Sequence, residues 1–458
     1  MLTLRESFRS VLTAYSNWKG SSIHRKIMGA TIIVAVFTGV AKIAFFGKEL
    51  LVAWQFGTTD LLDAFLIAYV VPSFAINLIA GSINVAVIPT YVHVREHTGQ
   101  GSANQLYASV MTLSIVFLTV CTGLIVLCAP LYLQILASGF APDKLKLTLD
   151  LLYVISPVII LSGITTIRAA ILNAEEKFAT PALIPIVTPG ITILLIVFLG
   201  HPLSIYVLAL GLVIGQIVEA SWLGFALKRR GVTRSWGWQG FDSNLRQIVQ
   251  QFLPMMAGAF LLGSTQLVDQ AFAASLPAGN VAVLSYGNKV ASFPLQIAAT
   301  AIGTSFLPYF SAMLAKNDWQ AARQTLNRYL KLIFLITVPI TFLLVLFSEP
   351  LVGLLLQRGA FTEADTRLVA DVQALGALQI PFYLGGILIV RLISAMKANY
   401  ILMWGAVISL VINFFADYAL MKIFGVAGIS FSTSIVYFSS FVFLTMMLRS
   451  MYARIDAD

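Results

Sequence analysis

The sequence predicts an all-α polytopic membrane protein with about twelve transmembrane helices in two pseudo-symmetric six-helix lobes. Composition is the first observation behind this. Hydrophobic residues make up 59% of the 458 residues and charged residues only 11%, whereas a soluble domain carries roughly 25% charged residues. The apolar residues also lie in runs long enough to cross about 30 Å of hydrocarbon as helices. They do not form the alternating segments of about ten residues that are typical of a β-barrel.

The expected spans follow from these apolar runs. They lie near 27–56, 61–88, 106–136, 149–172, 178–199, 203–227, 247–273, 281–310, 328–348, 368–393, 400–423 and 427–448. Before them, residues 1–24 place apolar side chains at helical spacing, with Arg5 and Arg9 between them. This pattern is typical of an amphipathic helix on the cytoplasmic membrane surface.

The distribution of basic residues predicts the orientation. One set of alternate connections, which includes both termini and the 228–246 segment, contains 21 of the 29 Lys and Arg residues. The opposite set contains only Lys144, Lys146, Arg358 and Arg367. By the positive-inside rule, both termini and 228–246 are cytoplasmic. The net charge of +9 is therefore an orientation signal, and we expect no nucleic-acid partner.

An internal repeat is the second observation behind the fold class. The 228–246 linker divides the chain into an N-lobe (25–227) and a C-lobe with a short cytoplasmic tail (247–458). Several residues recur in the second half at a nearly constant spacing. The pairs are Val71 and Val290, Ser73 and Ser292, Phe74 and Phe293, Pro89 and Pro308, Pro130 and Pro350, Pro157 and Pro381, and Arg168 and Arg391. Parallel lobes around a central site suit alternating access, and span prolines such as Pro72, Pro157, Pro294 and Pro381 are expected to kink the helices.

Ionisable residues inside spans are costly and usually face an interior cavity. Three cations from the two lobes, Lys42, Lys48 and Lys289, can converge there on an anion. Asp63 is a further candidate for substrate binding, whereas Asp269 and Glu49 are candidates for ion binding or gating. Two other interpretations stay open, since Lys48 and Glu49 can snorkel to the outer interface and Lys42 can form a structural ion pair with Asp63 or Asp269. The in-span candidates are Lys42, Lys48, Glu49, Asp63, Asp269 and Lys289.

The sequence contains no pattern of a covalent active site, so we expect no catalytic residues. There is no phosphate-binding loop of the Walker type. His93 and His97 have the spacing of a metal pair but lie in a polar loop, and Cys121 and Cys128 share one apolar span. We therefore expect no metal site and no disulfide framework.

Three segments resemble the MurJ/MviN lipid II flippase family, within the multidrug/oligosaccharidyl-lipid/polysaccharide exporter superfamily. They are FGTTDLLDAFLIAYVVPSFAINLIAGSINVAVIPTY (56–91), SYGNKVASFPLQIAATAIGTSFLPYFS (285–311) and LLLQRGAFTEADT (354–366). The similarity extends from about residue 27 to residue 448. It implies a V-shaped pair of lobes and passage of a lipid-linked saccharide diphosphate through a central cationic cavity.

The resemblance also implies roles for particular residues. Lys42 and Lys48 fall where the family has cavity arginines, Asp63 on the aspartate of its DAF motif, and Lys289 on an essential arginine. Two features depart from the family pattern. Ile76 and Asn77 replace an arginine pair of the second helix, and the family's two further C-terminal helices are not present. These departures leave room for another polyprenyl-diphosphate-linked glycan as the substrate.

The sequence thus predicts a bacterial inner-membrane flippase for a lipid-linked saccharide diphosphate, either lipid II or a related cell-wall or exopolysaccharide precursor. Its partners would be that substrate, membrane lipids and glycan synthesis enzymes. No cofactor is expected, and a Na⁺ or H⁺ gradient or the membrane potential would drive transport. Two alternatives remain: a cation-coupled drug exporter of the same superfamily, and a membrane scaffold for glycan synthesis that transports nothing.

Overall fold

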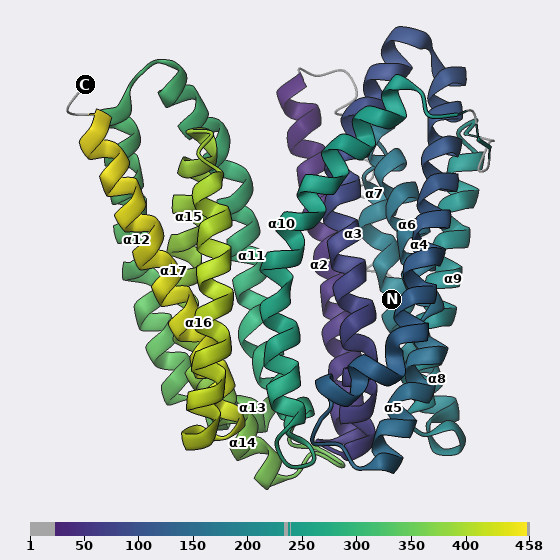
Figure 1. Cartoon of the computed structure of the whole chain (residues 1–458), viewed down its shortest axis with the longest axis vertical. Helices are drawn as coiled ribbons and strands as arrows, with labels where there is room; N and C mark the ends of the chain where they lie inside the picture. The colour runs from purple at the N-terminus through teal and green to yellow at the C-terminus, as the bar shows by residue number, and fades with distance from the viewer. Residues whose placement is uncertain (1–22, 233–236, 239, 456–458) are drawn as a thin grey trace, which may run out of the picture. The chain divides into compact units, whose positions relative to one another are not determined.

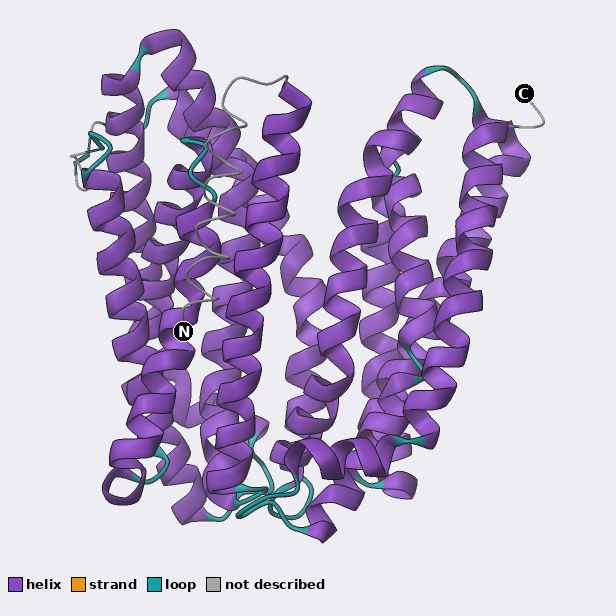
Figure 2. Cartoon of the chain, turned by 180° about the vertical axis from the view of Figure 1, so that it is seen from behind, coloured by secondary structure: helices purple, strands orange, loops and turns teal. Residues whose placement is uncertain are grey.

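In a computed structural model, the described residues are 23–232, 237–238 and 240–455, and they fold into helices joined by short turns (Figure 1). No strand occurs within these ranges (Figure 2). The predicted surface helix at 1–24 lies almost entirely outside them. The elements are α2 (Ile23–Phe56), α3 (Asp60–Thr98), α4 (Gln100–Leu136), α5 (Pro142–Ile155), α6 (Pro157–Ala174), α7 (Ala179–Leu183), the 3₁₀ turn η1 (Ile184–Ile186), α8 (Val187–Leu203), α9 (Tyr206–Lys228), α10 (Ser243–Ala274), α11 (Asn280–Ala315), α12 (Trp319–Leu346), α13 (Ser348–Leu356), α14 (Glu363–Ala377), α15 (Ile380–Ala395), α16 (Tyr400–Phe424) and α17 (Val426–Ile455).

Length and composition confirm most of the predicted spans. Within the described residues, ten helical stretches are long and apolar enough to cross a membrane, and each overlaps one of the expected spans. The other two expected spans, 27–56 and 247–273, coincide with the helices α2 and α10. The all-helical, polytopic membrane fold predicted from composition is therefore confirmed.

Two prolines that were expected to kink helix interiors instead begin new helices. Pro157 is the first residue of α6, and only Ser156 separates it from the end of α5. Pro381 lies in the first turn of α15, which follows α14 after a short break. Proline is tolerated at a helix start because the amide hydrogen it lacks has no partner there. Because Pro157 and Pro381 are repeat-related, the two halves break at matching places.

Small residues bring α8 and α9 close together. A Cβ atom built on Gly211 would lie 2.5 Å from the Thr192 hydroxyl oxygen, and one on Gly215 would lie 2.5 Å from that of Thr188. Within a bilayer, helix association depends on packing rather than on removal of apolar surface from water, so small residues at the interface favour it. The glycines of α9 therefore determine how closely it packs on α8.

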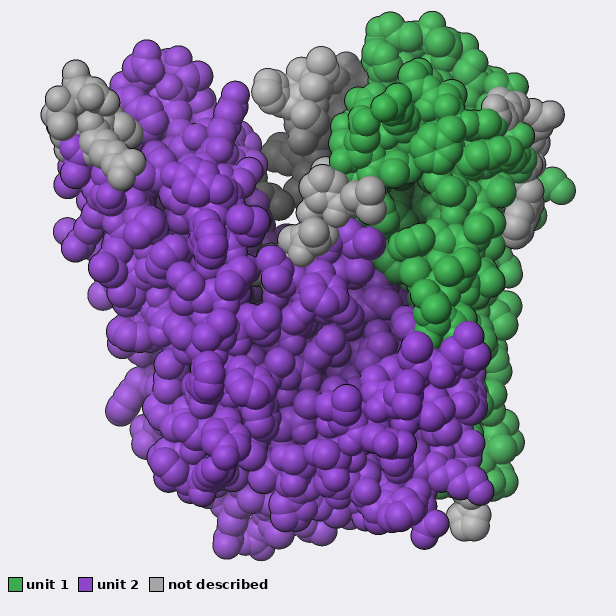
Figure 3. All heavy atoms as spheres, viewed as in Figure 1, with its two compact units in different colours: residues 1–51, 79–124, 154–253 green, residues 52–78, 125–153, 254–458 purple. Residues whose placement is uncertain are grey.

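The chain divides into two compact units, coloured separately in Figure 3. Unit 1 comprises residues 1–51, 79–124 and 154–253, and unit 2 comprises 52–78, 125–153 and 254–458. The borders fall within α2, α3, α4, α5 and α10. The division into an N-lobe and a C-lobe joined by the 228–246 linker stays a prediction.

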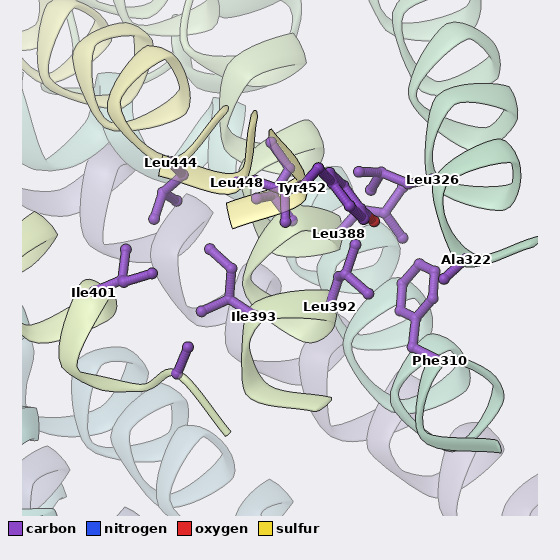
Figure 4. Packing of buried hydrophobic residues seen from close by; sticks show 12 residues of the cluster. Phe310, Ala322, Leu326, Leu388, Leu392, Ile393, Ile401, Leu444, Leu448 and Tyr452 are labelled. Atoms are coloured by element: carbon purple, nitrogen blue, oxygen red, sulfur yellow. The ribbon is translucent and has the colours of Figure 1, made fainter. Parts of the chain in front are cut away.

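Unit 2 contains a large apolar cluster in which α11, α12, α15, α16 and α17 meet (Figure 4). Phe310, Leu388 and Leu392 are fully buried in it, and Tyr452 packs from the end of α17. Many individually weak dispersion contacts stabilise such a cluster. Other apolar side chains point outward, such as Leu127 and Ile135 on α4 and Leu335 on α12. In a membrane helix, an outward apolar side chain contacts lipid.

The close contact between α8 and α9 predicts opposite effects for two glycine substitutions. Gly215→Ala should lower the free energy of unfolding by about 1–3 kcal/mol, because its methyl group would overlap Thr188. Gly190→Ala in α8 should be neutral or stabilising by up to about 1 kcal/mol, because no atom lies within 4 Å of the added methyl group and alanine favours helix. Thermal unfolding in detergent micelles measures both. Equal effects of the two substitutions would contradict this packing.

Candidate functional site

Asp63, in the first turn of α3, joins that helix to the start of α11. Its side chain is 1% exposed. One carboxylate oxygen accepts a hydrogen bond from the backbone amide of Gly279 (2.7 Å), and the other accepts one from that of Ala282 (2.8 Å). Gly279 is the N-cap residue of α11. The carboxylate thus caps α11 from a different helix, where free amide groups and the helix dipole favour a negative charge.

Lys144, in the first turn of α5, completes this group. Its ammonium nitrogen lies 2.9 Å from the carboxylate of Asp63 and also contacts the carboxylate of Asp60. It further lies 3.9 Å from the centre of the Phe140 ring. We call Asp60, Asp63, Lys144, Gly279 and Ala282 the Asp63 cap. It joins the starts of α3, α5 and α11, and all five residues belong to unit 2.

A second group of contacts joins the end of α2 and the turn after it to the start of α14 and the segment before it. The amide of Ala360 donates a hydrogen bond to the carbonyl of Trp54 (2.9 Å), and the Thr58 hydroxyl donates one to Asp365. Gly359 has a positive φ of 62°, and a Cβ there would lie 2.4 Å from the Trp54 carbonyl oxygen. Only glycine allows so close an approach in this conformation.

A second polar cluster surrounds Asp269 in α10. One oxygen of its carboxylate accepts a hydrogen bond from the Asn413 side-chain amide (2.8 Å) and the other accepts one from the Thr433 hydroxyl (3.5 Å). Asp417, one turn beyond Asn413 on α16, is fully buried beside Asp269. We call Asp269, Asn413, Asp417 and Thr433 the Asp269 cluster.

The Asp269 cluster is incompletely satisfied. Within the described residues, neither carboxylate oxygen of Asp417 nor the side-chain carbonyl oxygen of Asn413 receives a hydrogen bond. Two adjacent buried carboxylates cannot both remain charged without a compensating cation. Carboxylate, amide and hydroxyl oxygens are the ligands of hard cations. The arrangement can therefore accommodate a proton or a small metal cation.

Lys42, Lys48 and Glu49 all lie on α2 in unit 1. The ammonium group of Lys48 is 2.5 Å from the carboxylate of its neighbour Glu49, and it lies 4.6 Å from the centre of the Phe45 ring. Glu49 is buried, whereas Lys42 is exposed. Lys48 therefore has a local counter-charge while it remains partly accessible.

Lys289, in α11, is half-buried in unit 2, and its ammonium group lies 5.8 Å from the centre of the Tyr286 ring. Within unit 2, Asp63 and Asp269 contact Lys144 and Asn413. The alternative in which Lys42 pairs with Asp63 or Asp269 involves both units and stays a prediction. The predicted convergence of Lys42 and Lys48 with Lys289 involves both units and stays a prediction.

Another buried carboxylate, Glu219 in α9, was not singled out by the sequence. It accepts hydrogen bonds from the backbone amide (3.1 Å) and hydroxyl (2.6 Å) of Thr188 and from the side-chain amide of Gln216 (3.0 Å). Thr188 lies in the first turn of α8. Glu219 therefore caps α8 in the way that Asp63 caps α11, and this contact gives it a structural role.

The far end of α3 is joined to the end of α6. The guanidinium group of Arg95 donates a hydrogen bond to the Ala174 carbonyl (3.0 Å) and lies 3.4 Å from the carboxylate of Glu175. The Tyr91 hydroxyl donates to the same carboxylate (3.0 Å). Burial, reinforced by the charge of Glu175, raises the pKa of Tyr91, so its phenol stays a donor.

The histidines and cysteines that the sequence analysis considered as metal ligands or disulfide partners form no larger cluster. The rings of His93 and His97 lie 4.2 Å apart, and one nitrogen of His97 contacts the His93 carbonyl. Across the described residues, no group of three or more His, Cys, Asp or Glu side chains is placed to bind a metal. Cys121 and Cys128 are free thiols.

Sequence reasoning missed Lys144, Asn413, Asp417 and Thr433. Asp417 carried a usable signal, because an aspartate within an apolar span is costly and Asn413 precedes it by one helical turn. Lys144 carried none, since a lysine in a short connection is common. Its role depends on a contact with residues more than 80 positions away.

Comparisons with known proteins agree with this fold. A probable lipid II flippase MurJ from Synechocystis sp. is 28% identical over 442 residues, which cover 93% of this chain and 82% of the relative. A probable lipid II flippase MurJ from Rickettsia prowazekii is 25% identical over 408 residues, which cover 88% of this chain and 80% of the relative. Among solved structures, a lipid II flippase MurJ in an inward closed conformation matches with a TM-score of 0.77 and 22% identity, over 91% of this chain and 87% of that one. An inward-facing multidrug resistance MATE family transporter matches with a TM-score of 0.72 and 14% identity, and the match covers 92% of this chain and 99% of the transporter.

The chain shares its fold with these two solved transporter structures, and its apolar helices are long enough to cross a membrane. These two findings define the class of protein: a multi-pass membrane protein with this transporter fold. The family itself comes from the sequence. A model of the family described as lipid II flippase MurJ matches residues 52–456. The chain belongs to this family, as its sequence signatures predicted.

The Asp63 cap predicts a specific loss of stability. Asp63→Asn should lower the free energy of unfolding by about 1–3 kcal/mol, because it removes the charge that faces Lys144 and leaves one buried donor without an acceptor. Asp143→Asn is the matched control: this neighbour of Lys144 is exposed, so its change should stay within about 0.5 kcal/mol. Chemical or thermal unfolding measures the difference. An Asp63→Asn protein as stable as the parent would show that the cap contributes little.

Proposed function

We propose that this protein is a flippase, which moves a polyprenyl-diphosphate-linked saccharide from the cytoplasmic to the outer leaflet of the bacterial inner membrane by alternating access. Family membership over residues 52–456 is the observation that supports this most directly. It favours a flippase over a drug exporter or a scaffold. Membership of a transporter family also agrees with the expectation that the chain performs no covalent catalysis.

In the proposed orientation both termini are cytoplasmic, as the excess of basic residues in one set of connections indicates. The starts of α3, α5, α11 and α14 then lie at the outer surface. The Asp63 cap and the contact between Trp54 and Ala360 join helix ends on that side. We propose that these contacts close the outer gate, so that the transport cycle must break them before the substrate can leave.

The substrate would be recognised through its diphosphate. Lys42, Lys48 and Lys289 keep the positive charge of the family's arginines but lack the planar fork that binds phosphate through two parallel hydrogen bonds. Glu49 beside Lys48 offers an alternative partner that a diphosphate must displace. We propose that this competition helps to release the head group once the outer gate opens.

The Asp269 cluster would supply the driving force. Its unsatisfied oxygens suit one Na⁺ or H⁺, and moving one elementary charge across the membrane potential is worth about 2.3 kcal/mol per 100 mV. Because the cluster joins α10, α16 and α17, binding or release of a cation would change how these helices pack. That change would bias one arrangement of the transporter over the other.

The lysines can be tested by a flipping assay in liposomes that contain a lipid-linked saccharide diphosphate. Lys48→Arg and Lys289→Arg should retain or increase the flipping rate, since arginine restores the bidentate geometry. Lys48→Gln and Lys289→Gln should weaken substrate binding by roughly 10- to 100-fold, the effect of losing one charge-assisted contact. Lys422→Gln, an exposed lysine of α16 that faces Tyr418, is the matched control and should flip at the parental rate. Parental rates in both glutamine variants would refute the cationic-cavity mechanism.

The coupling cation can be tested in the same liposomes with imposed Na⁺ or pH gradients. Asp269→Asn and Asp417→Asn should abolish the dependence of flipping on one of these gradients, because each removes a charge that the cation compensates. Glu219→Gln is a matched control, since this buried carboxylate already accepts three hydrogen bonds from α8 and Gln216. It should leave the gradient dependence unchanged. If both aspartate variants respond to the gradients like the parent, the Asp269 cluster is not the coupling site.

A further inference from the structure

A cavity of about 250 Å³ lies outside both groups described above. Three chain segments that are distant in sequence line it: the turn between α10 and α11, the middle of α14, and the turn between α16 and α17. The lining residues that matter here are Leu276, Pro277, Asn280, Leu368, Asp371 and Phe424. All belong to unit 2. We call this cavity the α14 pocket.

Asp371 gives the α14 pocket its charge. Its side chain is exposed and has no ion pair or hydrogen bond to any described residue. Glu349 acts on it as a like charge and is itself paired with Arg367, whose guanidinium nitrogen lies 3.6 Å from the Glu349 carboxylate. The side-chain amide of Asn280 donates its hydrogen bond to the Pro277 carbonyl (2.7 Å). The polar part of the pocket therefore lacks a cation and would repel an anion.

The other walls of the pocket are mainly apolar, from Leu276, Leu368 and Phe424. Its volume is below the roughly 300–1,000 Å³ of sites for drug-sized ligands, so a ligand must be small. An apolar wall beside one unpaired carboxylate suits a ligand with one cationic end and a short apolar body. We propose that the α14 pocket binds a primary ammonium group carried on a short apolar chain.

Two residues of the pocket lie close in sequence to Gly279, which belongs to the Asp63 cap. Pro277 and Asn280 stand on either side of the α11 N-cap, whose residue Gly279 donates its amide hydrogen to Asp63. A ligand in the pocket thus contacts the same turn that the Asp63 cap fixes. A ligand that binds only this arrangement stabilises it by mass action. Occupancy therefore keeps the turn in its capped position.

This last step rests on the proposed function and its orientation, in which the capped turn closes the outer gate. An amine that reaches the pocket from outside would then slow flipping. The ammonium group can come from two sources, a free amphipathic amine or the ethanolamine head group of an outer-leaflet phospholipid. Both present the same chemistry to Asp371.

Binding is tested first, without any transport assay. The purified full-length protein in detergent is titrated with n-hexylammonium, and the midpoint of thermal unfolding is followed. The midpoint should rise with n-hexylammonium but not with equal concentrations of n-hexanol. Asp371→Asn should raise the apparent Kd about tenfold or more, through loss of a charge-assisted contact. Leu368→Trp, at a position that is 46% exposed and so tolerant of change, should narrow the pocket and also abolish the rise.

Glu349→Gln is the matched control, because Glu349 lies near Asp371 but does not line the pocket. Its apparent Kd for n-hexylammonium should stay within about threefold of the parent, as for other exposed charges. Equal stabilisation by n-hexanol and n-hexylammonium, or an unchanged Kd in Asp371→Asn, would overturn the proposal.

Two further arms separate the ligand source and the proposed function. In nanodiscs, weaker n-hexylammonium binding in phosphatidylethanolamine than in phosphatidylcholine, which has the same net charge but no primary ammonium group, would assign the head group as resident ligand. Equal binding would assign a free amine. Either result supports the site. In proteoliposomes, external n-hexylammonium should slow flipping by the parent but not by Asp371→Asn. If n-hexylammonium binds but no lipid-linked saccharide is flipped, the proposed function fails and the site stands; if flipping proceeds and n-hexylammonium does not bind, the site fails alone.

Discussion

The buried carboxylate of Asp63 lies where the starts of three helices meet. A charge removed from water is stable only when it is paired and hydrogen-bonded. Asp63 satisfies this condition with the ammonium group of Lys144 and two amide groups of α11. Any movement that separates α3, α5 and α11 must expose this charge to water or give it new partners. The same interaction therefore contributes to the free energy needed to separate these three helix starts.

The buried carboxylates differ in how completely their oxygens are hydrogen-bonded within the protein. Glu219 accepts three hydrogen bonds and caps α8. Asp417 accepts none from the described residues and adjoins another carboxylate. A hydrogen-bonded carboxylate needs no further partner, whereas Asp417 lacks one among the described residues. Asp371, at the α14 pocket, also has no hydrogen-bond or ion-pair partner among the described residues, but its side chain is exposed.

Glycines at the helix ends make these contacts possible. Gly57, Gly279 and Gly359 all have positive φ, and a Cβ on any of them would lie 2.4 Å from a backbone oxygen of another segment. The three glycines lie in unit 2, next to the Asp63 cap or to the contact between Trp54 and Ala360. The backbone approaches closely enough for hydrogen bonds between helix ends only because these residues lack side chains. The turn that borders the α14 pocket is one of these places.

The sequence by itself determined the membrane spans, the helical class and the family, because hydropathy is a local property and the signature segments are contiguous. It also identified Asp63 and Asp269, since a charge within an apolar span stands out without any knowledge of contacts. Only the tertiary structure decided what those charges contact. Lys144 follows Asp63 by 81 positions, and Asn413 follows Asp269 by 144. Prolines show the same limit: the sequence predicted kinks at Pro157 and Pro381, whereas in the structure each lies at the start of a new helix. Pairing across such distances depends on how the helices pack, and no local pattern in the chain records it.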